Sequence, residues 1–226
     1  MIYIRSFLFH FLFYFTTFIF LVIGFPWYIG KWKGDWILKS WSHMNVFYLK
    51  YILGTNVKTS GLEILKNQGP CIIACQHQSA FETVTFFRYC TFAFVYKDQL
   101  NNIPIYGYFM RKSGMILVNR EQGAKSLKEL LKGGKKALEE RGGIIIFPEG
   151  RRIPVGQVGP INPGLWALYQ SLKIPVIPVT LNSGLYWPAK KFLKYPGTIE
   201  VNFHAPFEPG LPRGEFEEKL RDLFQA

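Results

Sequence analysis

The chain has 226 residues, a length that indicates one globular domain with an appendage and argues against two full domains. Apolar residues make up 49% of the chain and aromatic residues 17%, enough for a sizeable buried core. Lys and Arg outnumber Asp and Glu by 27 to 15, so the net charge of +12 favours an anionic partner: nucleic acid, anionic lipid or a phosphorylated substrate.

The first segment is apolar and long enough to cross a bilayer. No Asp, Glu, Lys or Arg lies between Ser6 and Gly30, and about 20 apolar residues suffice for a spanning helix. A cleaved signal peptide has a shorter apolar region and a small-residue cleavage site, so we predict a retained anchor. Arg5 precedes the segment and four lysines follow it, which places the rest of the chain on the cytoplasmic side of the inner membrane if the segment spans. The alternative is a buried core helix.

An amphipathic helix is predicted next, over residues 35–54. The apolar side chains that repeat there at helical spacing are Ile37, Trp41, Met44, Tyr48 and Tyr51. With its lysines elsewhere around the helix, this segment suits a lipid headgroup layer, although it would also pack on a globular domain. We therefore predict a membrane anchor with an amphipathic helix over residues 1–55.

Strand-like and helix-like segments alternate beyond about residue 55. The predicted strands are residues 69–75, 91–96, 114–118, 142–148, 174–181 and 197–207, and the predicted helices are residues 80–89, 124–140, 165–172 and 215–224. Such alternation indicates an α/β domain over residues 56–226, with a mixed, largely buried sheet flanked by helices.

A histidine and a carboxylate stand where the first of these strands turns into a helix. His77 follows the strand, and Glu82 falls in the first turn of the helix. In one regular helix this separation would turn the two side chains about 140° apart, so they can meet only if His77 lies in the turn. A carboxylate that holds one imidazole nitrogen leaves the other able to accept a proton, as in a base dyad. The alternative is a structural histidine with a nearby acid.

Two further apolar strands end in arginines. One ends in Asn119-Arg120 and the other in Glu149-Gly150-Arg151-Arg152. A guanidinium pairs two phosphate oxygens at once, and ligands of open α/β sheets gather beyond the carboxyl ends of the strands. These arginines therefore predict a phosphate-binding site, with solvated surface arginines as the alternative.

Taken together, His77 with Glu82, then GMILVNR, FPEGRR and IPVIPV resemble, in order and spacing, the four blocks of the glycerolipid acyltransferases. More narrowly, the chain looks like the bacterial 1-acylglycerol-3-phosphate acyltransferases, over about residues 60 to 205. The resemblance implies that His77 is the catalytic base and that Glu82, where the family more often has Asp, orients it.

The resemblance also implies a substrate site. The residues that match the second and third blocks are Gly114, Arg120, Glu149, Gly150 and Arg152. The arginine of the second block is thought to bind the phosphate of the acceptor. Arg151 replaces the usual Thr of the third block and adds a cation beside the acceptor site. Pro178 matches the fourth block, which is linked to acyl-donor binding or to shaping the site.

The implied reaction moves a fatty acyl group from a thioester of coenzyme A or acyl carrier protein to the free sn-2 hydroxyl of lysophosphatidic acid, giving phosphatidic acid. It requires no serine nucleophile, metal or further cofactor, and the implied partners are membrane phospholipids and the two substrates, not nucleic acid. Two alternatives stay open: another lyso-lipid as acceptor, and a non-enzymatic basic membrane-binding module.

The remaining patterns are less informative. A basic stripe at helical spacing, formed by Lys125, Lys128, Lys132 and Lys135, would meet lipid headgroups, coenzyme A phosphates or an acidic carrier protein, or it is a solvated face. The chain has no Gly-x-Ser-x-Gly, dinucleotide, phosphate-loop or zinc-protease motif. Its three cysteines fit no zinc-site spacing.

Overall fold

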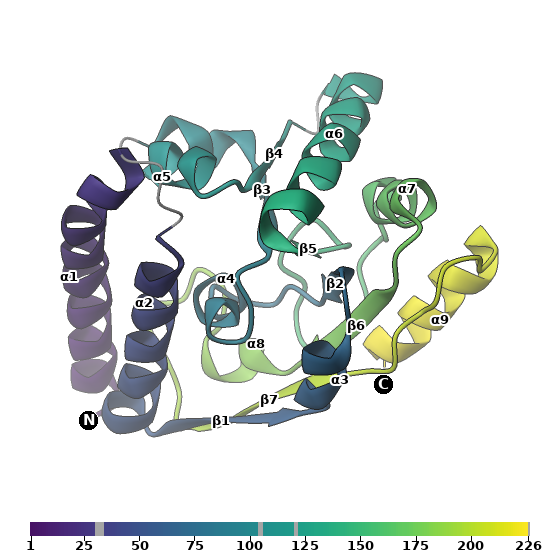
Figure 1. The fold of residues 1–226 in the computed structure, drawn as a ribbon. Coiled ribbons are helices and arrows are strands. Elements are labelled where there is room, and N and C mark those ends of the chain that lie inside the picture. The colour runs from purple at the N-terminus through teal and green to yellow at the C-terminus, as the bar shows by residue number, and fades with distance from the viewer. Residues whose placement is uncertain (30–33, 104–105, 120–121, 226) are drawn as a thin grey trace. The chain divides into compact units, whose positions relative to one another are not determined.

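The computed structural model describes residues 1–29, 34–103, 106–119 and 122–225 (Figure 1). Two compact units are formed from discontinuous segments. Unit 1 comprises Met1–Ser60, Gln78–Thr91 and Leu181–Asn202, and unit 2 comprises Gly61–His77, Phe92–Thr180 and Phe203–Ala226. The two units are defined by the contacts within each of them, and their boundaries differ from the predicted domain boundary between residues 55 and 56. That domain boundary stays a prediction.

Unit 2 contains a sheet whose strands lie in the order β6-β2-β5-β3-β4. The strands are β2 (Cys71–Cys75), β3 (Ala93–Lys97), β4 (Ile116–Val118), β5 (Gly143–Ile146) and β6 (Val176–Leu181). These neighbours pair in parallel; Ile73 of β2, for example, is opposite Ile145 of β5 on one side and Ile177 of β6 on the other. An antiparallel bridge between Val176 and Phe207 gives the sheet its mixed character.

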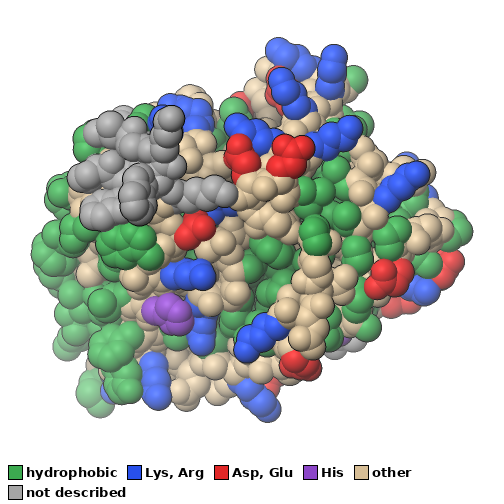
Figure 2. All heavy atoms as spheres, viewed as in Figure 1, with side chains coloured by type: hydrophobic (Ala, Val, Ile, Leu, Met, Phe, Trp, Pro, Cys, Tyr) green, Lys and Arg blue, Asp and Glu red, His purple; other side chains and the backbone are tan. Residues whose placement is uncertain are grey.

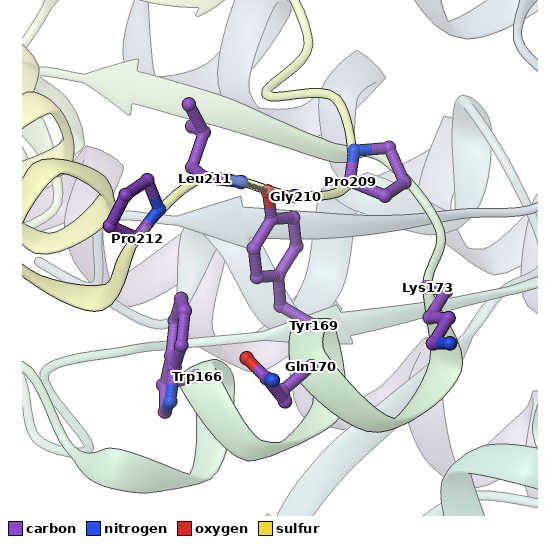
Figure 3. Close-up of a pocket in the computed structure, with 8 residues that line it drawn as sticks. All are labelled: Trp166, Tyr169, Gln170, Lys173, Pro209, Gly210, Leu211 and Pro212. Atoms are coloured by element: carbon purple, nitrogen blue, oxygen red, sulfur yellow. Dashed lines mark hydrogen bonds between the residues drawn. The ribbon is translucent and has the colours of Figure 1, made fainter.

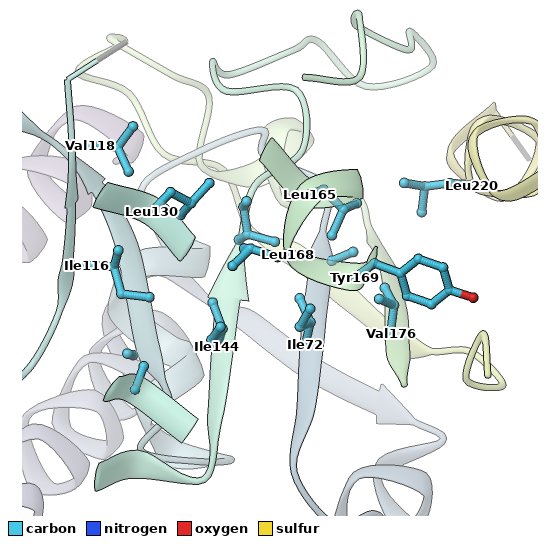
Figure 4. Packing of buried hydrophobic residues seen from close by; sticks show 14 of the residues in the cluster. Ile72, Ile116, Val118, Leu130, Ile144, Leu165, Leu168, Tyr169, Val176 and Leu220 are labelled. Atoms are coloured by element: carbon cyan, nitrogen blue, oxygen red, sulfur yellow. The ribbon is translucent and has the colours of Figure 1, made fainter. Parts of the chain in front are cut away.

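Helices complete unit 2. They are α3 (Leu62–Asn67), α5 (Tyr106–Lys112), α6 (Ala124–Arg141), α7 (Pro163–Leu172) and α9 (Arg213–Gln225), with a 3-10 turn η3 (Asp98–Asn102). Ile72 and Ile144 of the sheet share one buried cluster with Leu130 of α6, Leu168 of α7 and Leu220 of α9, so these three helices pack on the same face (Figure 4). The predicted α/β fold with a largely buried, helix-flanked sheet is confirmed.

Unit 1 contains the N-terminal helices and a pair of strands. Its elements are α1 (Ile2–Ile29), α2 (Asp35–Tyr48), a π-helical turn η1 (Leu49–Leu53), β1 (Thr55–Ser60), α4 (Phe81–Thr85), a 3-10 turn η2 (Phe86–Arg88), α8 (Ser183–Tyr186) and β7 (Gly197–Phe203). Strand β1 pairs in parallel with β7, from Thr55 opposite Gly197 to Ser60 opposite Asn202. The predicted N-terminal apolar helix is present as α1, and its residues Ile2–Phe25 are long and apolar enough to cross a membrane.

The two N-terminal helices bury narrow faces. Phe9 of α1 is fully buried and meets the ring of Trp187 edge-on, with 5.0 Å between ring centroids. In α2 the buried residues are Ile37, Ser42, Asn45 and Tyr48. Met44 and Tyr51 of the predicted apolar stripe are instead exposed, and the small polar residues Ser42 and Asn45 take inner positions of α2.

Candidate active site

The predicted site segments of unit 2 follow strands that run in parallel. His77 comes two residues after β2, Phe147 directly after β5, and Pro178 lies within β6, which pairs with β2. Strand β4, which ends at Val118, belongs to the same sheet. Because the carboxyl ends of parallel strands meet at one edge, the segments that follow β2, β4 and β5 in the first three sequence blocks lie at that edge, whereas Pro178 of the fourth block lies inside β6.

His77 is half-buried and is held on three sides by the residues that follow β5. Its backbone N–H donates to Oε2 of Glu149 at 3.2 Å, and its carbonyl oxygen accepts from the N–H of Ile153 at 2.7 Å. The ring of Phe147 stacks on the imidazole, with 4.1 Å between centroids and 18° between planes. The backbone and the ring plane of His77 are thus both fixed by one turn, which we call the 147–153 turn.

Glu149 is the buried centre of that turn. Its side chain is 3% exposed, and its second oxygen, Oε1, accepts from the N–H of Gly159 at 3.0 Å. Each carboxylate oxygen therefore binds a backbone donor, which offsets the cost of burying the charge. The sequence predicted Glu149 in the site but gave no sign of this bridge between β2 and the loop after β5.

Two predicted substrate-binding glycines occupy turns that favour glycine. Gly150 has φ 68° and donates its N–H to the carbonyl of Phe147 at 3.0 Å. Gly114 has φ 70° and donates to the carbonyl of Arg111 at 3.1 Å, just before β4. Residues with a Cβ rarely adopt these angles, so both positions have a conformational reason for glycine.

Two of the predicted phosphate-binding arginines follow β5 along the chain. Arg151 and Arg152 are exposed at the end of the 147–153 turn, where their guanidinium groups can reach a ligand. Arg120 lies outside the described residues. Pro178 is buried within β6, opposite Ala74, and its carbonyl accepts from the N–H of His204 at 3.0 Å.

Glu82 belongs to unit 1, in the first turn of α4, as predicted for the strand-to-helix junction. It is fully buried, and its carboxylate accepts from the backbone N–H of Ser79 at 3.1 Å and of Gln78 at 3.4 Å. The hydroxyl of Ser183 makes a short hydrogen bond to Oε1. The acid thus orders the turn that follows His77 in the chain.

Ser183 and Gln78 were not predicted. The side chain of Gln78 donates to the carbonyl of Leu181 at 2.7 Å and accepts from the N–H of Gly184 at 3.1 Å, on either side of Ser183. These bonds join the turn before α4 to the start of α8 within unit 1. The available signal for Ser183 was a small polar residue two positions after the apolar β6.

A second histidine lies beside the sheet of unit 2. Nε2 of His204 is 2.8 Å from the hydroxyl of Thr180, and burial lowers the pKa of its imidazole. The ring is therefore neutral over a wider range of pH than an exposed histidine.

Unit 2 also contains a surface pocket of about 530 Å³ (Figure 3). Its walls are Trp166, Tyr169, Gln170 and Lys173 of and after α7, and Pro209, Gly210, Leu211 and Pro212 before α9. The hydroxyl of Tyr169 accepts from the N–H of Leu211 at 3.0 Å, which ties the two walls together. The predicted site residues do not line this pocket.

Basic side chains are concentrated on α6. In Figure 2 blue side chains gather at the top, over one end of α6, and the four lysines of the predicted stripe are exposed. Among the described residues, no group of three or more His, Cys, Asp or Glu side chains is arranged to hold a metal ion.

Comparison with known proteins adds the family context. The family model described as acyltransferase matches residues 56–182. A 1-acyl-sn-glycerol-3-phosphate acyltransferase of Pseudomonas aeruginosa is 36% identical over 168 residues, which cover 73% of this chain and 64% of that protein. The corresponding protein of Saccharomyces cerevisiae is 29% identical over 198 residues, covering 82% and 64%. The chain thus spans less than two thirds of the length of both relatives.

A solved structure has a similar fold. The crystal structure of the 1-acyl-sn-glycerophosphate acyltransferase of Thermotoga maritima matches with a TM-score of 0.78, over 100% of this chain and 95% of that one. The two sequences are 21% identical, so this likeness shows a shared fold.

Proposed function

This chain belongs to the acyltransferase family, and on that premise we propose that it acylates lysophosphatidic acid. The acyl group would come from a thioester and go to the free sn-2 hydroxyl, giving phosphatidic acid. The observation that carries the proposal is the 147–153 turn, which joins the third sequence block to His77 of the first.

His77 acts in this mechanism as the general base. Its imidazole takes the proton of the acceptor hydroxyl while that oxygen attacks the thioester carbonyl, and the tetrahedral oxyanion then collapses and expels the thiolate. The thiolate takes the proton back from the imidazolium, which restores the base. General-base help is typically worth about 10²–10⁴-fold in rate. Glu82 is proposed, from its place in the first block, to orient the imidazole.

Arginines provide the acceptor site in this proposal. Arg152 and Arg120 match block positions that the family uses near the phosphate, and Arg151 adds a third cation. A guanidinium binds a phosphate through two charge-assisted hydrogen bonds, which fixes direction as well as position. Holding the acceptor in line with the base contributes about 7–11 kcal/mol in well-aligned cases.

The donor is either acyl-coenzyme A or acyl carrier protein. Both carry negative charge, on the phosphates of coenzyme A or on the acidic carrier protein, and the lysines of α6 offer an exposed basic face to either one. No cofactor beyond these co-substrates takes part in the proposed reaction.

Membrane attachment is proposed to use the exposed face of α1. Large apolar side chains cover that face, among them Phe7, Phe11, Phe15 and Phe18, and Figure 2 shows hydrophobic side chains along the left, over α1. Such a helix lies in the headgroup and acyl boundary with its apolar side towards lipid. The cytoplasmic face of the inner membrane remains the proposed location, because the anionic lipids of that leaflet attract the lysines that follow α1.

The opposite side of α1 argues against a free transmembrane span. Ser6 accepts from the N–H of Lys194 at 3.0 Å, Nε2 of His10 is 2.9 Å from the carbonyl oxygen of Phe192, and Nε1 of Trp41 donates to Thr17 at 2.9 Å. Residues 6 to 17 correspond to about 16 Å of helix, roughly half of the hydrocarbon thickness. One side of α1 is therefore covered by protein instead of lipid over residues 6 to 17, and we propose that α1 inserts into one leaflet of the membrane.

A topology experiment tests this insertion. Arg5→Cys, at an exposed charged position near the start of α1 and in a chain without Cys90, is treated with a membrane-impermeant maleimide in sealed inverted vesicles. One-leaflet insertion exposes this cysteine on the same side as a cysteine at Lys58. Labelling of the first site only after the vesicles are opened would instead establish a span.

The activity experiment combines detergent-solubilised protein with lysophosphatidic acid and a long-chain acyl-coenzyme A, then with the acyl carrier protein thioester. Phosphatidic acid and free thiol are measured together. His77→Ala is expected to abolish transfer and retain the fold, while His43→Ala, at an exposed position of α2, retains activity.

Each contrary result has a distinct meaning. Turnover by His77→Ala removes His77 from the mechanism. Thiol release without phosphatidic acid points to thioester hydrolysis or to another lyso-lipid acceptor. Lipid binding without transfer, for either donor and for other lyso-lipids, favours a non-enzymatic membrane-binding module.

A further inference from the structure

The 147–153 turn touches His77 in three chemically different ways. Glu149 accepts the backbone N–H, Ile153 donates to the backbone carbonyl, and Phe147 covers one face of the imidazole. All of these residues lie in unit 2, so the contacts are internal to one compact unit. A histidine with both backbone groups bonded and one ring face stacked has few orientations open to it.

Stacking restrains the ring without blocking its chemistry. The planes of His77 and Phe147 are 18° apart, so the Phe147 ring covers the flat face of the imidazole. Both ring nitrogens project from the edge of the imidazole, within its plane. A proton therefore reaches a nitrogen while the stack stays intact.

The surroundings of Glu149 suit a fixed support better than a substrate contact. Its carboxylate is 3% exposed and each oxygen has a backbone donor, from His77 and from Gly159. At 3% exposure this carboxylate offers little access to a substrate group, and a phosphate would also meet a like charge. Arg151 and Arg152, which are exposed, have no such obstacle.

We propose that Phe147 and Glu149 are positioning residues for His77 and that Glu149 does not contact the acceptor. The proposal rests on the proposed role of His77 as the base. It assigns the third sequence block two separate tasks: its first residues orient the base, and its two arginines face the substrate.

Two variants separate positioning from substrate binding. Glu149→Gln replaces one carboxylate oxygen by an NH₂ group, which then faces a backbone N–H and breaks either the His77 or the Gly159 bond. Phe147→Leu keeps an apolar side chain but removes the ring. Since a misplaced catalytic group costs up to about 100-fold, we expect kcat to fall about 10- to 100-fold in each, with the KM for lysophosphatidic acid within about twofold of wild type.

A spectroscopic readout follows His77 without reference to turnover. The chain has four histidines, so selective ¹³C labelling of the ring Cε1 position gives a spectrum that four His→Ala variants assign. The Phe147 ring, 4.1 Å away, shields the His77 ring proton, and Phe147→Leu is expected to move this signal downfield. The signals of His43 and His204 serve as internal references.

Asn162→Ala is the matched control. The Asn162 side chain donates to the carbonyl of Pro148 at 2.9 Å, so it holds the same loop through a residue that makes none of the three contacts to His77 described above. It is expected to lower the melting temperature while kcat and the His77 signal stay at wild-type values.

The outcomes distinguish the two proposals. A raised acceptor KM in Glu149→Gln, with kcat and the His77 signal unchanged, overturns the positioning role. An unmoved His77 signal in Phe147→Leu overturns the stack, and this variant also decides the matter if Glu149→Gln does not fold. A wild type without transferase activity defeats the proposed function alone, because the spectrum still reports whether the turn orients His77.

Discussion

Glu82 is a carboxylate without exposure to water, and such a group depends on its hydrogen-bond donors. Its donors are the Ser183 hydroxyl and the backbone N–H groups of Gln78 and Ser79. Removing one partner leaves part of the buried charge unsatisfied, at a cost of about 1.5–3 kcal/mol for a bond to a charged group.

Ser183→Ala should therefore lower the free energy of unfolding by that amount. Ser42 offers a matched comparison, because it is equally buried in unit 1 but donates to the neutral carbonyl of Thr85 at 2.9 Å. Ser42→Ala is expected to cost about 1 kcal/mol, as for a neutral hydrogen bond. Urea unfolding of both variants in detergent measures the difference. A loss of unfolding free energy for Ser183→Ala that is equal to or smaller than that for Ser42→Ala would contradict a hydrogen bond from Ser183 to a charged carboxylate.

Arg151 is the residue at which this chain departs from its family's third block. Because its exposed guanidinium adds a cation next to Arg152, Arg151→Thr should raise the KM for lysophosphatidic acid about 5- to 20-fold and leave kcat nearly unchanged. Arg221→Thr, at an exposed position of α9, is the control. An unaltered KM for Arg151→Thr would mean that the additional charge does not reach the acceptor.

At the scale of the element, strand β2 is buried along its whole length, and this burial changes the reactivity of its cysteines. Burial raises the pKa of the Cys71 thiol to about 12, so the reactive thiolate is scarce at pH 8. The reactivity of Cys71 should increase as the pH is raised towards 12, because a larger fraction of its thiol is then ionised.

Iodoacetamide at pH 8 should accordingly modify the half-buried Cys90 first and leave Cys71 intact until the protein is unfolded. Peptide mass spectrometry over a time course, with and without urea, follows each site. Equal rates for the two cysteines in the folded protein would contradict the burial of β2.

The start of α3 depends on one glycine. Gly61 has φ 69°, and a Cβ there would lie 2.1 Å from the backbone oxygen of Phe203, which cannot easily move aside. Gly69, two residues beyond the end of the same helix, has nothing within 4 Å of such a Cβ.

Gly61→Ala is expected to destabilise the protein by about 1–3 kcal/mol, because alanine rarely adopts the left-handed backbone conformation. The clash of the Cβ with the Phe203 oxygen adds to this loss. Gly69→Ala should change stability by less than about 0.5 kcal/mol in either direction. Thermal unfolding compares the two, and a tolerated Gly61→Ala would mean that α3 moves away from Phe203.

At the scale of the molecule, local pattern predicted most elements. Helix α6 was predicted to end before Gly142 and ends at Arg141, followed by Gly142 with φ 74°. Strand β1 was missed because its polar sequence, Thr55–Ser60, has no apolar run and is stabilised by pairing with β7, far away in the chain. Pairing over such a distance leaves no trace in local periodicity.

The features of the site likewise divide into those that local sequence predicted and those that depend on residues far apart in the chain. The strand-to-helix turn at His77 follows from local sequence, as does the arginine-bearing end after β5. The contacts of Phe147 and Glu149 with His77 depend on β2 and β5 being neighbours in the sheet, which hydrophobic pattern alone does not specify. Ser183 was missed for a similar reason, since its partner Glu82 lies about a hundred residues earlier.

Charge and apolar surface make separate contributions to the attachment of the whole molecule, and salt distinguishes them. The net charge of +12 attracts anionic lipid, but the Debye length falls from about 10 Å at 0.1 M salt to about 3 Å at 1 M. Burial of the exposed Phe11 and Phe15 of α1 in lipid does not weaken with salt in this way.

We therefore expect the protein to stay on vesicles of mixed anionic and zwitterionic phospholipid when salt is raised to 1 M. Phe11→Asp with Phe15→Asp should weaken binding at every salt concentration, because it places charges on the face that enters lipid. Neutralising the exposed Lys190 and Lys191 with Gln should weaken binding only at low salt. Vesicle flotation measures all three proteins, and complete release of the wild type by salt would make the attachment electrostatic and leave α1 outside the lipid.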